Sequence, residues 1–287
     1  MALALPNSQL VDLSGPDAAR FAHAQFANDV LALKPGHWQW NAWLSPQGRV
    51  RWFFALLRPA PDRLLLWPRG GAASTLREEL ARFVFRAKVR PDVPEQLRAT
   101  GAEEAEIFTA FGSCPDGDAL ASHADALALR LPFGARWLLL ADRAPAQAAD
   151  ATALLQWQLD DIHAGLPLLA PALQDQLLPQ WLGLDRLHAF STSKGCYPGQ
   201  EVMARLHFKG GNKRWLYHVG FACDALPPPG TRIGSETGDA ATLVDAVLTR
   251  PHRAEGLAVL SDAAAAGRLG DSATAALSDI QVISRFS

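Results

Sequence analysis

The chain has 287 residues, of which 49% are hydrophobic and 20% are charged. This length allows about two domains of roughly 150 residues, and the apolar content supports a sizeable core and excludes wholesale disorder. Lys and Arg number 27 against 29 Asp and Glu, which gives a formal charge of -2. That balance excludes a globally basic nucleic-acid coat but leaves room for a local basic patch.

The three cysteines are Cys114, Cys196 and Cys223. A sparse, odd set without a C-x-x-C pair is neither a disulfide framework nor a self-contained zinc or iron–sulfur ligand set. The eight histidines are scattered without an H-x-x-x-H spacing, so we predict no bound zinc. Reduced thiols favour a cytoplasmic protein. No run approaches the roughly 18 apolar residues of a transmembrane helix, and the stretch before Pro6 lacks the Lys or Arg of a secretory signal.

The first two-thirds of the chain predicts hairpins mixed with helices. Ser14 to Asp17 supplies a capping hydroxyl, an early proline and an acid, and apolar residues follow at helical spacing. Without a steady β-α alternation, these elements indicate an α+β fold. The other predicted elements are a hairpin over 38–57, a strand over 64–67, a helix over 74–84, a hairpin over 126–140, a helix over 146–162 and a helical segment over 173–187 interrupted by Pro179.

The pattern changes after about Arg214. Five short strand candidates, separated by Gly/Pro turns, occupy about 70 residues and predict a small β-barrel or sandwich. We therefore expect an α+β region over residues 1–213 and a C-terminal β-barrel domain over residues 214–287. The five candidates cover residues 215–222, 231–233, 242–249, 257–260 and 280–285.

One loop combines an irregular backbone with reactive residue types. Residues 194–201 read K-G-C-Y-P-G-Q-E, and two glycines and a proline in so short a stretch predict a tight turn that can bring backbone close to a ligand. Between 194 and 214 the only acid is Glu201, so the local field is positive and favours the thiolate of Cys196. An inert, buried cysteine in a structural turn is the alternative. The bases in this stretch are Lys194, Arg205, Lys209, Lys213 and Arg214.

This loop, with M-A-R over 203–205 and F-K-G-G-N-K-R over 208–214, resembles the signature of the YgfZ-type folate-binding proteins. Those proteins are relatives of the glycine-cleavage T protein, an aminomethyltransferase. The K-G-C-Y-x-G-Q-E stretch is highly specific, and weaker similarity covers nearly the whole chain, including the Ser45-Pro46-Gln47-Gly48-Arg49 turn and the closing strands. The resemblance implies an aminomethyltransferase-like folate-binding fold, ring-like with a central channel that holds folate, and a C-terminal small β-barrel.

The resemblance also implies a function. The chain is expected to be a tetrahydrofolate-binding accessory protein for the assembly or repair of iron–sulfur enzymes, with an effect on tRNA modification and with Cys196 as the key thiol beside Lys194. The expected partners are folate and iron–sulfur client or assembly proteins. The remaining loop residues singled out are Gly195, Tyr197, Gly199, Gln200, Glu201 and Arg205, and the folate-binding candidates are Asn28, Asp29, Trp157 and Gln180.

Several of these candidates have plainer interpretations that the sequence leaves open. Asp29 is either a pterin ligand or a cap of the turn after the first helix, and Trp157 either stacks on folate or fills a core. Lys194 binds an anion, lowers the pKa of the thiol or is simply solvated. The basic residues Arg205, Lys209, Lys213 and Arg214 would meet the glutamate tail of folate or a tRNA backbone, or form a solvated face.

Two departures from the relatives bear on activity. In the glycine-cleavage T protein a catalytic acid follows the hairpin glycine, whereas here no acid occurs between Gly48 and Leu57, and the next carboxylate is Asp62. Aminomethyl transfer needs a group that holds or deprotonates the folate amine region. We therefore favour a non-classical accessory factor over a tetrahydrofolate-dependent aminomethyltransferase, which stays the alternative. His163 stands where relatives tend to have Glu, and a neutral imidazole offers the pterin one acceptor and one donor.

Overall fold

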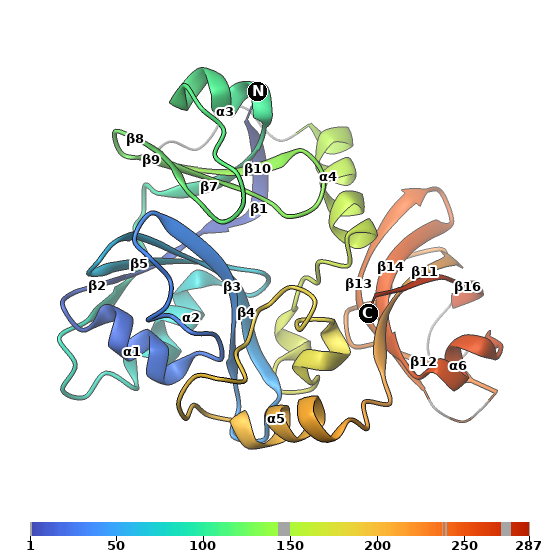
Figure 1. Cartoon of the computed structure of the whole chain (residues 1–287). Coiled ribbons are helices and arrows are strands. Elements are labelled where there is room, and N and C mark those ends of the chain that lie inside the picture. Colours follow the sequence, from blue (N-terminus) through green and yellow to red (C-terminus); the bar gives the residue numbers. More distant parts are fainter. Residues whose placement is uncertain (1, 143–149, 237, 239, 271–276, 287) are drawn as a thin grey trace. The chain divides into compact units, whose positions relative to one another are not determined.

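The computed structural model, shown in Figure 1, describes residues 2–142, 150–236, 238, 240–270 and 277–286. The chain divides into two compact units. Unit 1 comprises residues 1–43, 52–154 and 188–198, and unit 2 comprises residues 44–51, 155–187 and 199–287. Each unit therefore gathers segments that are distant in sequence. The predicted domain boundary after residue 213 concerns which parts of the chain fold independently. The two units describe spatial compactness instead, so the boundary stays a prediction.

The first sheet of unit 1 is buried beneath two helices. Its strand order is β3-β4-β5-β2-β6. Apolar faces of the helices meet apolar strand residues in one core, in which Phe26 packs edge-on against Phe54 with ring centroids 4.8 Å apart. The elements are β2 (Val11–Ser14), α1 (Ala18–Gln25), β3 (His37–Leu44), β4 (Val50–Ala60), β5 (Arg63–Pro68), α2 (Ala73–Ala81) and β6 (Arg90–Asp92).

The second sheet of unit 1 is antiparallel, with strand order β1-β7-β10-β9-β8. Helix α3 packs its one buried residue, Ile107, into a small core with the fully buried Trp137 of β10. The capping box of α3, formed by Glu103 and Glu106, satisfies backbone donors at its start. The elements are β1 (Leu3–Gln9), β7 (Arg98–Glu103), α3 (Glu104–Phe111), β8 (Ala121–His123), β9 (Ala126–Arg130) and β10 (Arg136–Ala141).

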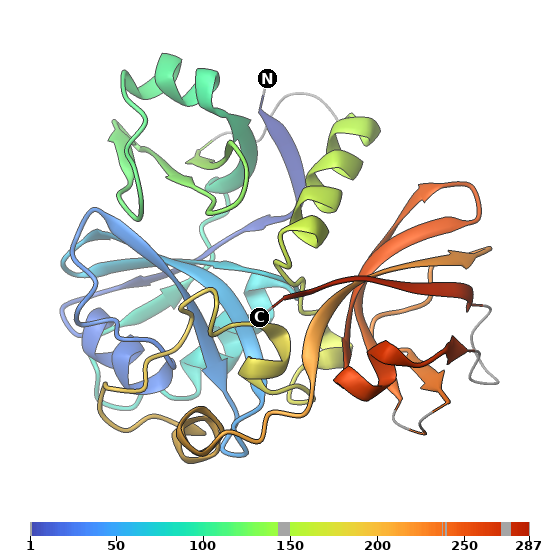
Figure 2. The same ribbon diagram turned by 45° about the vertical axis from the view of Figure 1, so that its right-hand side comes forward.

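Unit 2 contains a barrel-like antiparallel sheet with strand order β15-β12-β13-β14-β11-β16. Figure 2 shows these orange to red strands curling into a barrel-like sheet. The apolar core of this sheet includes Phe221, Leu243 and Leu260. The C-terminal β-barrel is thereby confirmed, with one very short strand more than expected. The elements are β11 (Trp215–Cys223), β12 (Arg232–Ser235), β13 (Ala241–Arg250), β14 (Arg253–Leu260), α6 (Asp262–Ala266), β15 (Leu269–Gly270) and β16 (Leu277–Phe286).

The rest of unit 2 is helical or irregular. It holds most of α4 (Ala151–His163), two 3-10 helices (Pro171–Leu173 and Pro179–Leu182), α5 (Gln200–Lys209) and the tip of the β3–β4 hairpin. No helix among the described residues is both long enough and apolar enough to span a membrane.

The α+β class and both predicted hairpins are confirmed, but three helix predictions need correction. The segment 173–187 is not an α-helix: a proline opens each 3-10 helix, and Asp175 and Gly183 have positive φ. Helix α2 ends at Ala81, and residues 82–84 continue in tighter 3-10 type bonds. Ser14 does not cap α1, because it lies in β2 and the helix begins after Asp17. For the helix predicted over 146–162, residues 143–149 lie outside the described residues.

Candidate functional site

The ammonium of Lys194 lies in a nest of main-chain oxygens in unit 1. Its Nζ donates hydrogen bonds to the carbonyl oxygens of His23, Phe26 and Asn28. His23 lies in the last turn of α1, where carbonyl oxygens lack intrahelical donors and carry partial negative charge, and Phe26 and Asn28 follow the helix. Lys194 is 7% exposed, so it is not the solvated lysine considered above. Burial lowers the pKa of Lys194 to about 8, although the nearby carboxylate of Asp29 acts in the opposite direction.

Asp29 caps the turn that follows α1. Its Oδ1 accepts hydrogen bonds from the backbone N–H groups of Leu31 and Ala32, both at 3.0 Å, and lies 3.2 Å from Nδ1 of His23. Burial lowers the pKa of His23, and the charge of Lys194 adds to that shift while Asp29 opposes it. Asp29 therefore caps this turn, its carboxylate is partly exposed, at 36%, and its role as a pterin ligand stays a prediction.

Asn28 ties three segments of unit 1 together. Its side-chain Nδ2 donates to the carbonyl oxygens of Trp40 at 2.9 Å and His188 at 2.7 Å. The Oδ1 of Asn41 in turn accepts the backbone N–H of Asn28 at 2.9 Å. These bonds, together with those of Lys194, hold residues 188–198 against the turn after α1.

The loop places Cys196 between two anchored neighbours. Tyr197 is buried, donates its hydroxyl to the carbonyl oxygen of Ser191 at 3.0 Å, and has its ring centroid 4.7 Å from the Lys194 ammonium. Cys196 itself is exposed, as is Gly195. The inert, buried cysteine considered from the sequence is therefore not what the fold contains.

The other two thiols have different surroundings. Cys223 is buried and Cys114 is partly buried, with its Sγ 3.5 Å from the carbonyl oxygen of Glu104. Burial raises the pKa of both thiols, and an acidic neighbour adds to the shift in each case. Of the three cysteines, Cys196 is the most exposed.

The remaining loop residues belong to unit 2 and begin α5. Gly199 is the N-cap of this helix, and a Cβ there would lie 2.4 Å from the carbonyl oxygen of Ser45 and 2.8 Å from Cα of Gly48. The hairpin turn and the start of α5 are thus in backbone contact. Gln200 is half-buried, whereas Glu201 and Arg205 lie exposed four residues apart on α5, on one side of the helix.

The two folate candidates in unit 2 are both buried. Trp157 on α4 is 8% exposed, and Gln180 is 6% exposed. The Nε2 of Gln180 donates to the carbonyl oxygen of Met203 in α5 at 3.1 Å, so this side chain fixes the second 3-10 helix against α5. Each residue thus has a packing role in unit 2.

Unit 2 also holds a cavity of about 370 Å³ that sequence reasoning did not foresee. Three guanidinium groups line it, those of Arg49, Arg214 and Arg232, and none of the described residues around it is an acid. Arg214 donates to the carbonyl oxygen of Ala240 at 3.1 Å and stacks over the indole of Trp181 at 5.6 Å. Because three guanidinium groups and no carboxylate stand among the described lining residues, the cavity suits an anionic ligand.

The fold defines the class of protein. Among solved structures, the glycine cleavage system aminomethyltransferase T from Bartonella henselae superposes with a TM-score of 0.65, covering 99% of this chain and 84% of that one at 14% sequence identity. The chain therefore has the aminomethyltransferase-like fold that the sequence resemblance implied.

Within that class the similarity is to YgfZ-type proteins. The tRNA-modifying protein YgfZ of Pectobacterium carotovorum subsp. carotovorum (strain PC1) is 29% identical over 252 residues, which cover 83% of this chain and 75% of the relative. The protein of the same name from Edwardsiella ictaluri (strain 93-146) is 29% identical over 265 residues, with 86% and 78% covered. No protein-family model matches the chain. The resemblance read from residues 194–214 is thus confirmed along most of the chain.

Proposed function

We propose that this chain is a tetrahydrofolate-binding accessory protein that supports tRNA modification through the assembly or repair of iron–sulfur enzymes, with Cys196 as its working thiol. The observation that carries the proposal is the loop in which buried Lys194 and Tyr197 hold an exposed Cys196. The similarity to proteins named tRNA-modifying protein YgfZ, and a fold shared with an aminomethyltransferase, support it.

The chemistry of the loop assigns separate tasks to its residues. A thiolate is the form of cysteine that attacks electrophiles and binds iron, and exposure lets Cys196 reach a client protein. Lys194 acts as a positioning residue, because its ammonium is bonded to three carbonyl oxygens rather than free for an incoming anion. We therefore assign the reactive step to the thiol alone.

Folate binding is the second part of the proposal. Asn28, Asp29, Trp157 and Gln180 stay its candidates. Titration of the protein with reduced folate, followed by quenching of the nine tryptophans, tests it directly. Trp157→Phe is expected to remove part of the quench and weaken binding. A titration without any quenching or calorimetric signal would remove folate from the proposal.

The role of the Cys196 thiol can be tested by complementation, in cells that lack their own protein of this type. Cys196→Ala is expected to leave iron–sulfur enzyme activity and tRNA thiolation unrestored, whereas Cys114→Ala is expected to restore both. Full rescue by Cys196→Ala would show that another residue does the work. The comparison is matched because Cys114 is also a free cysteine of unit 1.

The alternative of aminomethyl transfer lacks its catalytic acid. Strand β4 begins Val50-Arg51 and continues with apolar residues, so the segment after Gly48 offers bases where an acid is required. Release of methylene-tetrahydrofolate from an aminomethyl-lipoyl donor would establish the alternative, and we expect none.

A direct contact with tRNA is a second candidate function, favoured by the arginine-lined cavity of unit 2. Arg205, Lys209 and Lys213 are exposed and provide further positive charge on or just after α5. Binding through phosphates predicts an affinity that falls steeply with salt. Arg232→Ala is expected to reduce the salt slope by about one, and an absence of tRNA binding at low salt would remove this candidate.

A further inference from the structure

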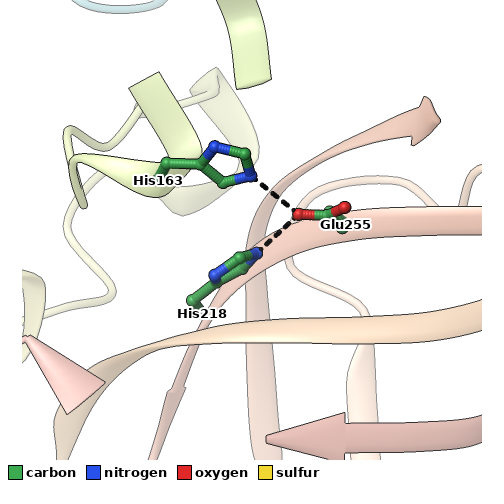
Figure 3. Close-up of side chains that lie close together, drawn as sticks. All are labelled: His163, His218 and Glu255. Atoms are coloured by element: carbon green, nitrogen blue, oxygen red, sulfur yellow. Dashed lines mark hydrogen bonds and ion pairs between the residues drawn. The ribbon is translucent and has the colours of Figure 1, made fainter. Parts of the chain in front are cut away.

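Three side chains that can bind metal converge in unit 2, as Figure 3 shows. Oε2 of Glu255 lies 2.9 Å from Nε2 of His163 and 2.8 Å from Nε2 of His218. All three ligand atoms lie within 4.8 Å of one another. No part of the proposed function uses this cluster.

The barrel strands place two of the three side chains on one face. His218 of β11 pairs with Leu257 of β14, and Glu255 lies two residues away on the same strand. Since side chains alternate along a strand, Glu255 shares the face of Leu257 and is the diagonal neighbour of His218. The paired strands therefore fix the spacing of the imidazole and the carboxylate.

The third side chain stands at the end of α4. His163 is the last residue of that helix, and Arg186 donates hydrogen bonds to the two carbonyl oxygens that follow, of Ala164 at 3.0 Å and Gly165 at 2.8 Å. The guanidinium of Arg186 also lies 5.3 Å from the ring centroid of Phe286 in β16. The helix end is thus clamped, and a ligand on a clamped element needs little reorganisation to bind.

The donor set points to a particular class of ion. Two imidazole nitrogens and one carboxylate oxygen are the ligands of catalytic zinc sites, which bind the metal through three side chains and keep a further position open. Nitrogen donors suit first-row transition ions, whereas magnesium and calcium prefer oxygen alone. Metal–ligand bonds of about 2.0–2.2 Å require only small movements of atoms already this close.

Exposure and charge agree with a site that is open on one side. The side chain of His163 is 49% exposed, that of Glu255 29% and that of His218 9%. Glu255 supplies the one carboxylate of the cluster, and the exposed side chain of His163 leaves an entry path from solvent.

We propose that His163, His218 and Glu255 bind one divalent transition-metal ion of the zinc class, through the Nε2 atoms and Oε2, with at least one coordination position facing solvent. Each imidazole now donates its Nε2 proton to the carboxylate, which can only accept. On binding, the proton of each ring shifts through solvent to Nδ1, and the lone pair of Nε2 turns to the metal. This proposal departs from the expectation of no zinc, which rested on local spacing only.

The test uses the whole 287-residue chain, stripped of metal with a chelator and kept free of folate. Calorimetric titration with Zn²⁺ is expected to give one site per chain, and Co²⁺ is expected to give visible absorption bands of a nitrogen and oxygen site without the thiolate charge-transfer bands that Cys196 would add. Bound Zn²⁺ is also expected to raise the melting temperature of the protein.

The variants separate this site from adventitious binding. Glu255→Gln and His163→Ala are each expected to weaken Zn²⁺ binding by at least about tenfold, in line with loss of one ligand. His252→Ala is the matched control, since His252 is also a histidine of unit 2 paired with a carboxylate, Asp224, at 2.8 Å. Failure of the wild-type protein to bind Zn²⁺, or binding by both ligand variants as tight as that of the wild-type protein, would leave only a hydrogen-bonded triad and overturn the proposal.

His163 is exposed at a helix end, so its replacement by Ala leaves the core of unit 2 in place and keeps the test valid if Glu255→Gln perturbs folding. The outcome is independent of the proposed folate function, because every readout is taken on the protein and the metal alone.

Discussion

Gly199 and Gly48 stand in backbone contact: a Cβ on Gly199 would lie 2.8 Å from Cα and 3.0 Å from N of Gly48. The two glycines come from the α5 start and the hairpin tip, segments that the sequence singled out separately. At Gly48 a Cβ would in turn lie 2.7 Å from Cβ of Val202 in α5. Two glycines are therefore required so that the turn and the helix can meet within unit 2.

Gly199→Ala is expected to destabilise the protein by about 2–6 kcal/mol. Gly199 has a φ of +79°, where a side chain costs roughly 1–3 kcal/mol, and the added methyl overlaps the carbonyl oxygen of Ser45 at 2.4 Å, for which overpacking adds about 1–3 kcal/mol. Urea denaturation measures the change in the free energy of unfolding.

Gly112→Ala is the matched control for that variant. Gly112 has φ of +73° and ψ of -4°, close to the +79° and +1° of Gly199, but nothing lies within 4 Å of its Cβ position. It is expected to show only the backbone cost, of about 1–3 kcal/mol. If both variants lost the same free energy of unfolding, the close approach of Gly199 to the hairpin would contribute nothing to the cost of the substitution.

Lys194→Met is expected to lower the free energy of unfolding by about 1–3 kcal/mol, because carbonyl oxygens near the end of α1 lose their charged donor. The loop 188–198 should also become more susceptible to limited proteolysis. Lys213→Met, at an exposed position, is expected to be nearly neutral. An unchanged proteolysis rate in Lys194→Met would argue against a positioning role.

The lysine also predicts a pH dependence of stability. The pKa of Lys194 is lowered to about 8 in the folded protein, whereas the pKa of a lysine in the unfolded chain is about 10.4. Between these values the unfolded chain binds more protons, so stability rises with pH across that window. Below pH 8 both states are protonated and the cost of burying the ammonium is present in full.

Comparison with Lys194→Met isolates this contribution. The stability of the wild-type protein relative to that variant is expected to increase from pH 8 to about 10, and unfolding measured by denaturant at several pH values records it. If the difference in unfolding free energy between the wild-type protein and Lys194→Met did not vary with pH, the three carbonyl oxygens would fully offset the cost of burying the ammonium.

Much of unit 1 follows from local patterns, but the chemistry of its loop does not. The hairpin of β3 and β4 follows from apolar residues and a Gly-containing turn, because both signals lie within a few residues of each other. The burial of Lys194 depends on carbonyl oxygens of the turn after α1, which are far away in the sequence. Asn41 is fully buried although alternation suggests an exposed position, because its amide oxygen bonds Asn28 and Ala42.

The sites of unit 2 could not be predicted for the same reason. Arg49 and Arg232 reach one cavity from a hairpin tip and a barrel strand, and only their neighbour Arg214 belongs to the basic stretch noticed in the sequence. The histidines His163 and His218 come from a helix and a strand, so no short motif joins them. Sequence motifs detect ligands that lie close together on one helix, strand or loop. The residues of these clusters come from different elements and meet only in the folded chain.

An ion-pair cluster near the C-terminus predicts an acid-sensitive contribution to stability. Asp262 accepts hydrogen bonds from the Tyr217 hydroxyl and from Arg285 at 3.0 Å, and these bonds lower the pKa of its carboxyl. The folded state therefore binds fewer protons, and the contribution is complete above the ordinary carboxyl pKa and lost as pH falls through the lowered value.

Asp262→Asn is expected to flatten the loss of stability on acidification below about pH 4, measured by thermal unfolding across a pH series. Asp224→Asn, at an exposed pair with His252, serves as control and is expected to leave the acid slope nearly unchanged. An acid slope in Asp262→Asn equal to that of the wild-type protein would refute the assignment.

The three thiols are expected to react in a fixed order. Cys196 is exposed, whereas burial raises the pKa of Cys114 and of Cys223, and each unit of pKa changes the thiolate fraction about tenfold. Iodoacetamide at neutral pH should therefore label Cys196 first, Cys114 more slowly and buried Cys223 last. Peptide mapping by mass spectrometry measures the three rates, and labelling in urea, where all three thiols should react alike, is the control. If Cys223 reacted as fast as Cys196 in the folded protein, the fold would not be the cause of the higher reactivity expected of Cys196.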